Sequence, residues 1–216
     1  MEITWHGHSC FRINERGMAA VVTDPYDPEV VGMDPGKLRA EVVTISCDSP
    51  AHNYTRAIRG KAFEITGPGE YEIGGVFITG VHINGSKRKR SPDDIRNTIY
   101  VIDYDGLKVV HLGELNSVPN QTEVEGLGEV NVALVPIGGK TSLNAAKAAE
   151  VISLLEPSIV IPMHYGMSES LLKLDPLSKF LKEMGLTTIE TEESIKLSSV
   201  NVLPEETRVM VLDLCL

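Results

Sequence analysis

Side chains that can bind a metal ion follow four of the apolar segments in this sequence. They are Asp24 after residues 19–23, His52 after residues 42–46, His111 with Glu114 at the end of residues 107–112, and His164 after residues 158–162. Sheets commonly place their functional sites just beyond the carboxyl ends of strands. Histidine nitrogen and carboxylate oxygen are good ligands for zinc and similar divalent ions. A single histidine at a strand end is usually an ordinary polar residue, but three of them with a glutamate indicate a metal site.

Residues 44–52 have the length and rhythm of a metal-binding turn written H-x-H-x-D-H. That pattern requires histidine at positions 47 and 49, aspartate at 51 and histidine at 52. The sequence has Cys47, Ser49, Ala51 and His52, so one ligand in four is kept. The function therefore depends on whether the chain still binds a metal.

Composition limits the class of protein. The 216 residues carry a net charge of −10, and a single domain over residues 1–216 is expected. No apolar run approaches the roughly 20 residues that cross a bilayer, and no signal peptide is recognisable at the start. The acidic charge argues against binding to nucleic acid or to an anionic membrane. Three scattered cysteines without C-x-x-C spacing favour a reducing, cytoplasmic location.

Short segments rich in Val, Ile, Thr and aromatic residues predict strands through the first two thirds of the chain. They are residues 3–5, 10–13, 19–23, 42–46, 63–66, 76–81, 98–104 and 107–112, with Asp105-Gly106 as a hairpin turn. Residues 131–136 and 158–162 are almost continuously apolar, which predicts strands buried on both faces. Residues 194–197 and 208–212 predict two late strands.

Few helices are predicted, and most of them come late. Residues 143–155 have an apolar stripe and predict a helix. A second helix is expected to run to about Met184, with Asp175 as its N-cap and Pro176 at its first position. A short helix is expected after His52. Two sheets with helices outside them, an α+β fold with αββα layering, accommodate many strands and few helices.

An ordered set of motifs identifies a family resemblance. They are Trp5-His6-Gly7-His8-Ser9-Cys10-Phe11, Thr23-Asp24-Pro25-Tyr26, Gly67-Pro68-Gly69-Glu70-Tyr71-Glu72, Asn97-Thr98-Ile99-Tyr100, His111-Leu112-Gly113-Glu114-Leu115, Pro136-Ile137-Gly138-Gly139 and Ile161-Pro162-Met163-His164-Tyr165. With them the sequence resembles the metallo-β-lactamase-fold hydrolases, in particular the branch of metal-dependent hydrolases that includes ascorbate-6-phosphate lactonase-like proteins. The resemblance covers nearly the whole chain and implies the four-layer αββα sandwich of that fold.

The resemblance also implies where two metal ions would bind. Positions 47, 49 and 111 would hold the first ion, positions 51, 52 and 164 the second, and an acidic residue at 114 would bridge them. His52, His111, Glu114 and His164 match this pattern, with glutamate in place of the commoner aspartate at 114. Positions 47, 49 and 51 do not match it, so the first site keeps His111, with Cys47 as a further candidate ligand.

Two functions stay open on this ligand count. One is a protein with a stripped dinuclear zinc site that is weakly active or non-catalytic and binds a small anionic ligand or a protein partner. The other is an active mononuclear hydrolase of a phosphoester, lactone or similar ester, using His52, His164 and Glu114, with Glu114 as the candidate catalytic group. Two histidines and one carboxylate are an accepted catalytic zinc set. The expected cofactor is therefore zinc or another divalent metal, at most one ion per chain, or none.

Several nearby residues have two readings. Cys47 is either a small buried filler or a thiolate ligand. Asp24 either supports the metal ligands through hydrogen bonds, as the resemblance implies, or begins a turn before Pro25. Asp48 is expected to cap the helix after the loop, whereas His6 and His8 are expected to be structural hydrogen-bonding residues.

One basic run stands out in this acidic chain. It consists of Lys87, Arg88, Lys89 and Arg90. Such a run is usually a solvated loop, and the functional alternative is a clamp for a phosphate group at the mouth of the site. The expected ligand is a small anion. The sequence is compatible both with a monomer and with a homo-oligomer.

Overall fold

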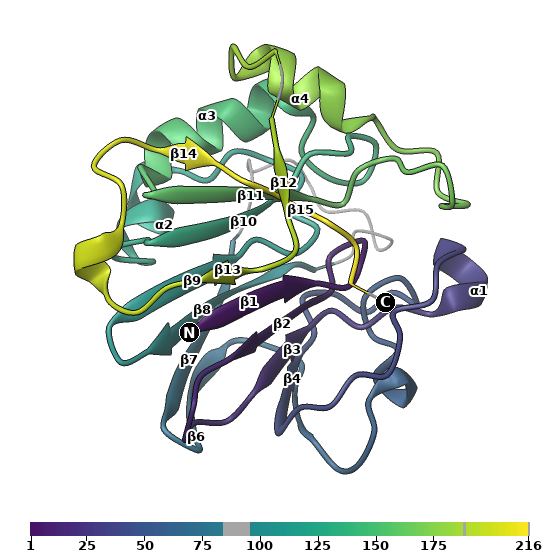
Figure 1. Cartoon of the computed structure of the whole chain (residues 1–216), viewed down its shortest axis with the longest axis vertical. Helices are drawn as coiled ribbons and strands as arrows, with labels where there is room; N and C mark the ends of the chain where they lie inside the picture. Colours follow the sequence, from purple (N-terminus) through teal and green to yellow (C-terminus); the bar gives the residue numbers. More distant parts are fainter. Residues whose placement is uncertain (84–95, 188, 216) are drawn as a thin grey trace.

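The structure is a computed structural model that describes residues 1–83, 96–187 and 189–215. Two β-sheets pack face to face, and helices lie outside them (Figure 1). The predicted αββα layering is confirmed. The basic run Lys87, Arg88, Lys89 and Arg90 lies outside the described residues.

The first sheet has six strands in the order β13-β1-β2-β3-β4-β5. Their bounds are β13 (Ile195–Lys196), β1 (Glu2–Trp5), β2 (Phe11–Asn14), β3 (Val21–Thr23), β4 (Val42–Thr44) and β5 (Phe63–Ile65). Neighbours pair antiparallel from β13 to β3, but β3, β4 and β5 run parallel. The carboxyl ends of β3 and β4 therefore meet at one edge of the sandwich.

The second sheet has seven strands in the order β14-β11-β10-β9-β8-β7-β6. Their bounds are β14 (Arg208–Val209), β11 (Ile159–Met163), β10 (Val132–Pro136), β9 (Leu107–His111), β8 (Thr98–Tyr104), β7 (Val76–His82) and β6 (Gly69–Ile73). Strands β9, β10 and β11 are parallel to one another. A separate pair joins β12 (Thr191–Glu192) to β15 (Val211–Leu212).

Alternation along the strands builds the layers. Val21 of β3 and Val42 of β4 contribute to the main core, whereas Val22 and Val43 contribute to a separate outer cluster that includes Val31 of α1 (Pro28–Val31). Successive side chains of a strand point to opposite faces, so the second cluster lies on the outer face of the six-stranded sheet. The helical layer on this side is short, because α1 and the 3₁₀ turn η1 (Thr55–Ala57) are its only described helical elements.

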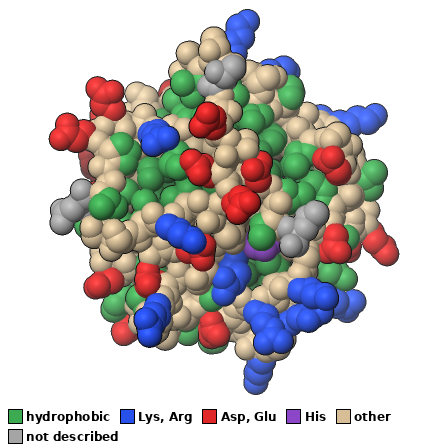
Figure 2. Space-filling view, viewed as in Figure 1, with side chains coloured by type: hydrophobic (Ala, Val, Ile, Leu, Met, Phe, Trp, Pro, Cys, Tyr) green, Lys and Arg blue, Asp and Glu red, His purple; other side chains and the backbone are tan. Residues whose placement is uncertain are grey.

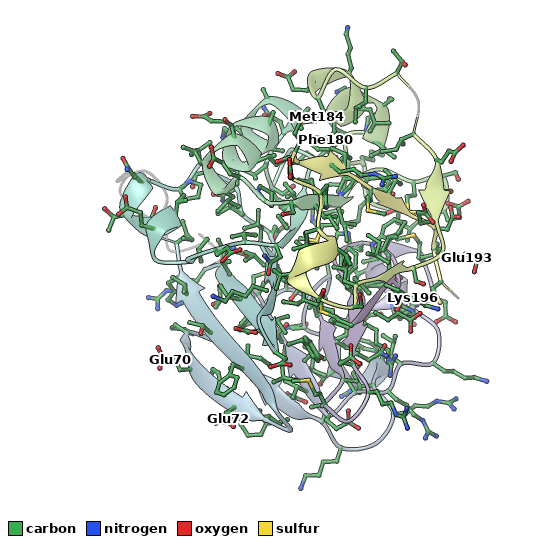
Figure 3. The ribbon with its side chains drawn as sticks, turned by 60° about the vertical axis from the view of Figure 1, so that its left-hand side comes forward. Glu70, Glu72, Phe180, Met184, Glu193 and Lys196 are labelled. Carbon is green, nitrogen blue, oxygen red and sulfur yellow. The ribbon has the colours of Figure 1, made fainter. Side chains whose placement is uncertain are left out.

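The helices α2 (Gln121–Glu125), α3 (Ala145–Leu155) and α4 (Leu177–Glu183) belong to the other side of the sandwich (Figure 1). In α3 the buried residues Ala148, Val151, Ile152 and Leu155 recur at helical spacing and pack into the main core. Phe180 of α4 is fully buried, and Met184 follows it beyond the end of that helix (Figure 3).

Two local predictions, the N-cap of α4 and a single strand over residues 208–212, are wrong. Residue 176 rather than Asp175 is the N-cap of α4, and the Asp175 side chain instead pairs with Lys179 at 2.6 Å. The predicted strand over residues 208–212 is divided between β14 and β15. The short helix expected after His52 is present as the 3₁₀ helix η1.

The surface agrees with the acidic composition. On one face, Lys and Arg side chains gather toward the lower right and acidic side chains are spread over the rest, whereas almost no histidine is visible (Figure 2). Glu70 and Glu72 are exposed on the edge strand β6 (Figure 3), where charge discourages pairing with another sheet. No helix in the described part of the chain is long and apolar enough to cross a membrane.

Candidate metal centre

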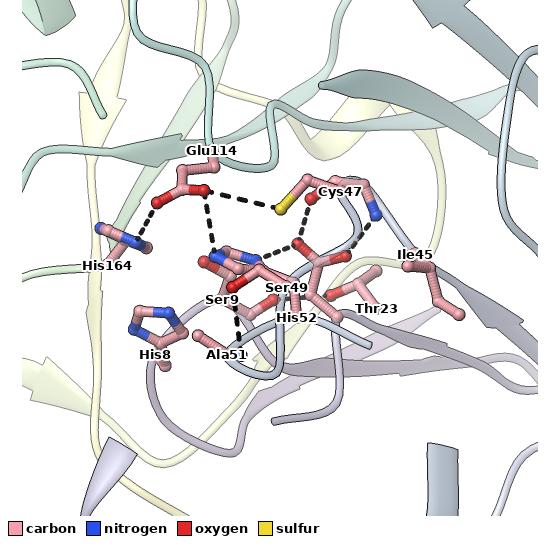
Figure 4. A network of polar contacts seen from close by, with 12 residues as sticks. His8, Ser9, Thr23, Ile45, Cys47, Ser49, Ala51, His52, Glu114 and His164 are labelled. Atoms are coloured by element: carbon pink, nitrogen blue, oxygen red, sulfur yellow. Dashed lines mark hydrogen bonds and ion pairs between the residues drawn. The ribbon is translucent and has the colours of Figure 1, made fainter. Parts of the chain in front are cut away.

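Both sheets contribute to one buried polar site. His111 ends β9, Glu114 follows it by three residues, and His164 follows β11. Asp24 follows β3, and His52 lies in the loop after β4. The parallel pairing within each sheet therefore brings these strand ends together, as Figure 4 shows for several of them.

Asp24 organises the side of the site formed by the first sheet. Its carboxylate is fully buried. The Oδ2 atom accepts hydrogen bonds from His52 Nδ1 at 2.8 Å and from Ser46 Oγ at 2.5 Å. The Oδ1 atom accepts one from the Ser46 backbone N–H at 2.7 Å. Burial alone would raise the pKa of Asp24, but His111, His52 and these hydrogen bonds together lower it. Asp24 is therefore ionised, and it holds His52 with the proton on Nδ1.

His52 consequently presents its other nitrogen to the site. Burial alone would lower the pKa of His52, but Asp24 and Glu114 raise it. The Nε2 atom is buried and has no hydrogen-bond partner, and it lies 3.9 Å from Glu114 Oε2. A carboxylate bonded to the far nitrogen of an imidazole is the arrangement that orients metal-ligating histidines.

Glu114 faces three side chains from the middle of the site. Its Oε2 accepts a hydrogen bond from the Cys47 thiol at 3.6 Å, and its Oε1 lies 3.7 Å from His164 Nε2 (Figure 4). Burial, with Asp24 and Glu114 nearby, raises the pKa of the Cys47 thiol, so this cysteine is a neutral donor here. The backbone N–H of Glu114 donates to Asn97 Oδ1 at 2.7 Å, which fixes the loop after β9.

Gly113 allows Glu114 to reach this position. Its φ is 60°, and a Cβ there would lie 2.4 Å from the Cβ of Ser46. We expect Gly113→Ala to destabilise the protein by more than the about 1–2 kcal/mol that left-handed backbone alone costs a residue with a Cβ. Gly106→Ala is the matched control, since Gly106 also has positive φ (89°) but has no atom within 4 Å of the added Cβ. Equal losses in urea unfolding of the two variants would contradict this account.

His164 and His8 lie against each other from opposite sheets. Both have positive φ, at 53° and 51°, and the His164 backbone N–H donates to the His8 carbonyl at 3.1 Å. Their rings are 4.2 Å apart between centroids. Burial and the neighbouring His52 lower the pKa of His164 to about 3, and burial with the other two histidines lowers that of His8. Both side chains are therefore neutral.

His111 points elsewhere. Its Nε2 donates to the carbonyl of Ser9 at 2.9 Å and lies 4.0 Å from Asp24 Oδ2, while its buried Nδ1 has no partner. Among the described residues it does not join either group whose ligand atoms lie within 4.8 Å of one another, namely His8 with His52 and His164, or Cys47 with His52 and Glu114. Of the four predicted ligands, His52, His164 and Glu114 meet and His111 lies apart.

The remaining sequence candidates occupy ordinary positions. Asp48 does not cap a helix; its Oδ1 accepts a hydrogen bond from Asn53 Nδ2 at 2.8 Å. His6 bonds to the carbonyl of Pro35 and is structural. His8, by contrast, was expected to be structural and lies in the site. The signal that could have found it is the one used for the others, since His8 also follows the end of a strand, β1.

The neutral buried histidines predict how stability depends on pH in metal-free protein. In the unfolded chain His8 and His164 titrate near 6.5, whereas in the folded protein their pKa values are lower. The unfolded state therefore binds more protons between about pH 4 and 6, and the free energy of unfolding falls as pH falls through this range. Each such histidine contributes up to about 1.4 kcal/mol per pH unit.

Urea unfolding in the presence of a chelator, repeated between pH 4 and 6, measures this slope. His164→Asn should reduce this slope by the contribution of one proton, about 1.4 kcal/mol per pH unit. An identical slope in the variant would show that His164 does not remain neutral when it is buried.

Comparison with known proteins identifies the family. Residues 2–164 match the model of the beta-lactamase superfamily domain. A UPF0173 protein of Pyrococcus furiosus is 31% identical over 85% of this chain and 90% of its own length, and a UPF0173 metal-dependent hydrolase of Thermoplasma acidophilum is 28% identical over 82% and 88%. The resemblance to ascorbate-6-phosphate lactonase-like proteins stays a prediction.

A solved structure agrees with these sequence matches. The crystal structure of a Thermotoga maritima protein assigned to the zinc-dependent hydrolases of the metallo-beta-lactamase superfamily has a TM-score of 0.78 and 34% identity, and the match covers 98% of this chain and 97% of that one. A metallo hydrolase of Ignicoccus hospitalis shares the fold with a TM-score of 0.62. The chain belongs to the metallo-β-lactamase superfamily and, within it, to the UPF0173 family of metal-dependent hydrolases.

Proposed function

We propose that this protein keeps the family's fold but has lost its two-metal centre, binds at most one divalent ion, and hydrolyses esters weakly or not at all. The proposal rests on the residue at position 47 and on its hydrogen bond. A cysteine stands there, and its thiol donates a hydrogen bond to Glu114, the residue expected to bridge two ions. The family pattern has a histidine ligand at position 47, so the neutral thiol takes the place of a ligand of the first ion.

The rest of the first site supports this proposal. Ser49 and Ala51 carry side chains that are too short or too apolar to replace histidine and aspartate as ligands. His111, the one expected ligand that remains, uses its Nε2 to donate to the Ser9 carbonyl. A single histidine does not hold zinc against water, since zinc takes about four ligands.

The second site retains more of its chemistry. His52 and His164 face opposite oxygens of Glu114, and Asp24 orients His52. This set fits one zinc ion, which when bound would polarise a water molecule or an ester oxygen. Without a second ion, and with Ala51 where an aspartate would orient the nucleophile, we expect a rate lower by a factor on the order of 10² or more.

A mononuclear hydrolase of a phosphoester, lactone or similar ester is the second candidate. The buried, unpartnered Nε2 of His52 favours it, because this atom is held ready to accept an ion. Glu114 would then be the general base. In either case we propose a cytoplasmic protein with a small anionic ligand, without nucleic-acid partners; homo-oligomerisation is a further proposal.

Metal analysis and turnover together test the proposal. We expect protein purified without chelator to contain one equivalent of zinc or less, and its hydrolysis of bis(p-nitrophenyl) phosphate and of a simple lactone to be close to background. Two equivalents with metal-dependent turnover would overturn it. One equivalent with strong turnover that Glu114→Gln abolishes would favour the second candidate, with Glu72→Gln as the control on an exposed strand.

A further inference from the structure

The loop between β1 and β2 contributes His8, a histidine to which the sequence pattern assigns no chemical role. His8 is 2% exposed, and its Nε2 is buried with no hydrogen-bond partner. A buried polar atom without a partner is costly, and a common explanation is a bound water or ion. His52 Nε2, the neighbouring nitrogen, is in the same state.

The backbone holds His8 in this place. Its carbonyl accepts hydrogen bonds from the Trp5 indole at 3.0 Å and from the His164 backbone N–H at 3.1 Å. Gly7 before it has φ of 90°, and a Cβ on Gly7 would lie 2.7 Å from the Tyr26 hydroxyl. The His8 ring is thus fixed beside those of His164 and His52, at centroid distances of 4.2 and 5.0 Å.

We propose that His8, His52 and His164 form a three-histidine site for a single zinc-like ion, with Glu114 beside it. The inference rests on the proposed single-ion function and adds a ligand to it. One ligand nitrogen from each of the three residues lies within 4.8 Å of the other two. Around tetrahedral zinc such nitrogens are about 3.4 Å apart, so the rings need to converge by only about an ångström.

A competing group contains Cys47, His52 and Glu114. The two groups exclude each other, because both need His52 Nε2 while its Nδ1 is bonded to Asp24. The three-histidine group is favoured because its ligands are neutral and its free nitrogens on His8 and His52 have no hydrogen-bond partner. The Cys47 proton is already used in the hydrogen bond to Glu114, and a thiolate there would stand beside two carboxylates. The three imidazoles require no such charge.

Zinc titration of chelator-treated protein tests the assignment, with a competing chromophoric chelator to report the free zinc. His8→Gln should weaken zinc affinity by about 100-fold or more, a loss at the upper end of those seen when the support of a metal ligand is removed. His6→Gln is the matched control, since His6 lies in the same turn but bonds to Pro35. Neither His6→Gln nor Cys47→Ala should change the affinity.

Zinc X-ray absorption on the unaltered protein avoids any effect of the variants on folding. We expect three imidazole ligands and no sulfur. A sulfur ligand, or His8→Gln binding zinc as the wild type does while His164→Gln does not, would overturn this inference and leave the proposed function intact. Failure of the wild type to bind zinc would overturn the three-histidine site while leaving a non-catalytic protein, with no ion at all, as the function.

Discussion

Combined replacement of Cys47→His, Ser49→His and Ala51→Asp is expected to raise zinc binding to two equivalents per chain and hydrolytic turnover by on the order of 10²-fold or more. The three changes return a ligand to each position where the family pattern has one. They also free Glu114 from the Cys47 thiol, so that its oxygens can face two ions. His111 would join the first ion through Nδ1, which has no hydrogen-bond partner, while its Nε2 donates to the Ser9 carbonyl.

Zinc stoichiometry and turnover of bis(p-nitrophenyl) phosphate measure this outcome. Asp48→His is the control, because it adds a histidine to the same loop at an exposed position. A triple variant that folds normally but still binds no more than one zinc would mean that the loss of the first site extends beyond these three residues.

Replacement of Asp24 is expected to be the most damaging single change. Asp24→Ala removes a fully buried carboxylate that accepts hydrogen bonds from His52 and from the side chain and backbone of Ser46. Breaking a buried charged pair by removing one partner costs about 3–5 kcal/mol. Zinc affinity should also fall by about 10- to 100-fold, because His52 loses the group that orients it.

Urea unfolding and zinc titration measure the two effects separately. Asp48→Ala is the control, since Asp48 bonds only to Asn53 on the surface of the same region. If Asp24→Ala were no less stable than Asp48→Ala, Asp24 would be a turn residue before Pro25 and not a support for the site.

The layered fold was predictable because its signals are local. Segments rich in Val, Ile, Thr and aromatic residues and the Asp105-Gly106 turn identify the hairpin of β8 and β9. Gly106 has the positive φ that such a turn favours. The division of residues 208–212 carries no such signal. Residues up to Met210 pair with β11, and the residues after it pair with β12 instead. The apolar sequence of residues 208–212 does not show whether they pair with one sheet or with two.

The site was predictable in part for the same reason. Strand ends and a known motif pointed to His52, His164 and Glu114, which the fold brings together. The separation of His111 and the arrival of His8 depend on side-chain direction and on a loop from the other sheet. Side-chain direction cannot be read from spacing along the chain, although His8, like the others, follows the end of a strand. The ligand roles of all these residues stay predictions.

The pairing of β1 with β13 has a consequence for how the chain folds during synthesis. Ile3 pairs with Ile195, and the Trp5 carbonyl accepts a hydrogen bond from the Cys215 N–H at 2.8 Å. These contacts join β1 to residues that are synthesised much later than β1. Until then one edge of the first sheet has no partner, and unpaired strand edges are prone to aggregation. Folding of this sandwich is therefore expected to finish only after β13 and Cys215 have been synthesised, and to benefit from chaperones that cover the unpaired edge.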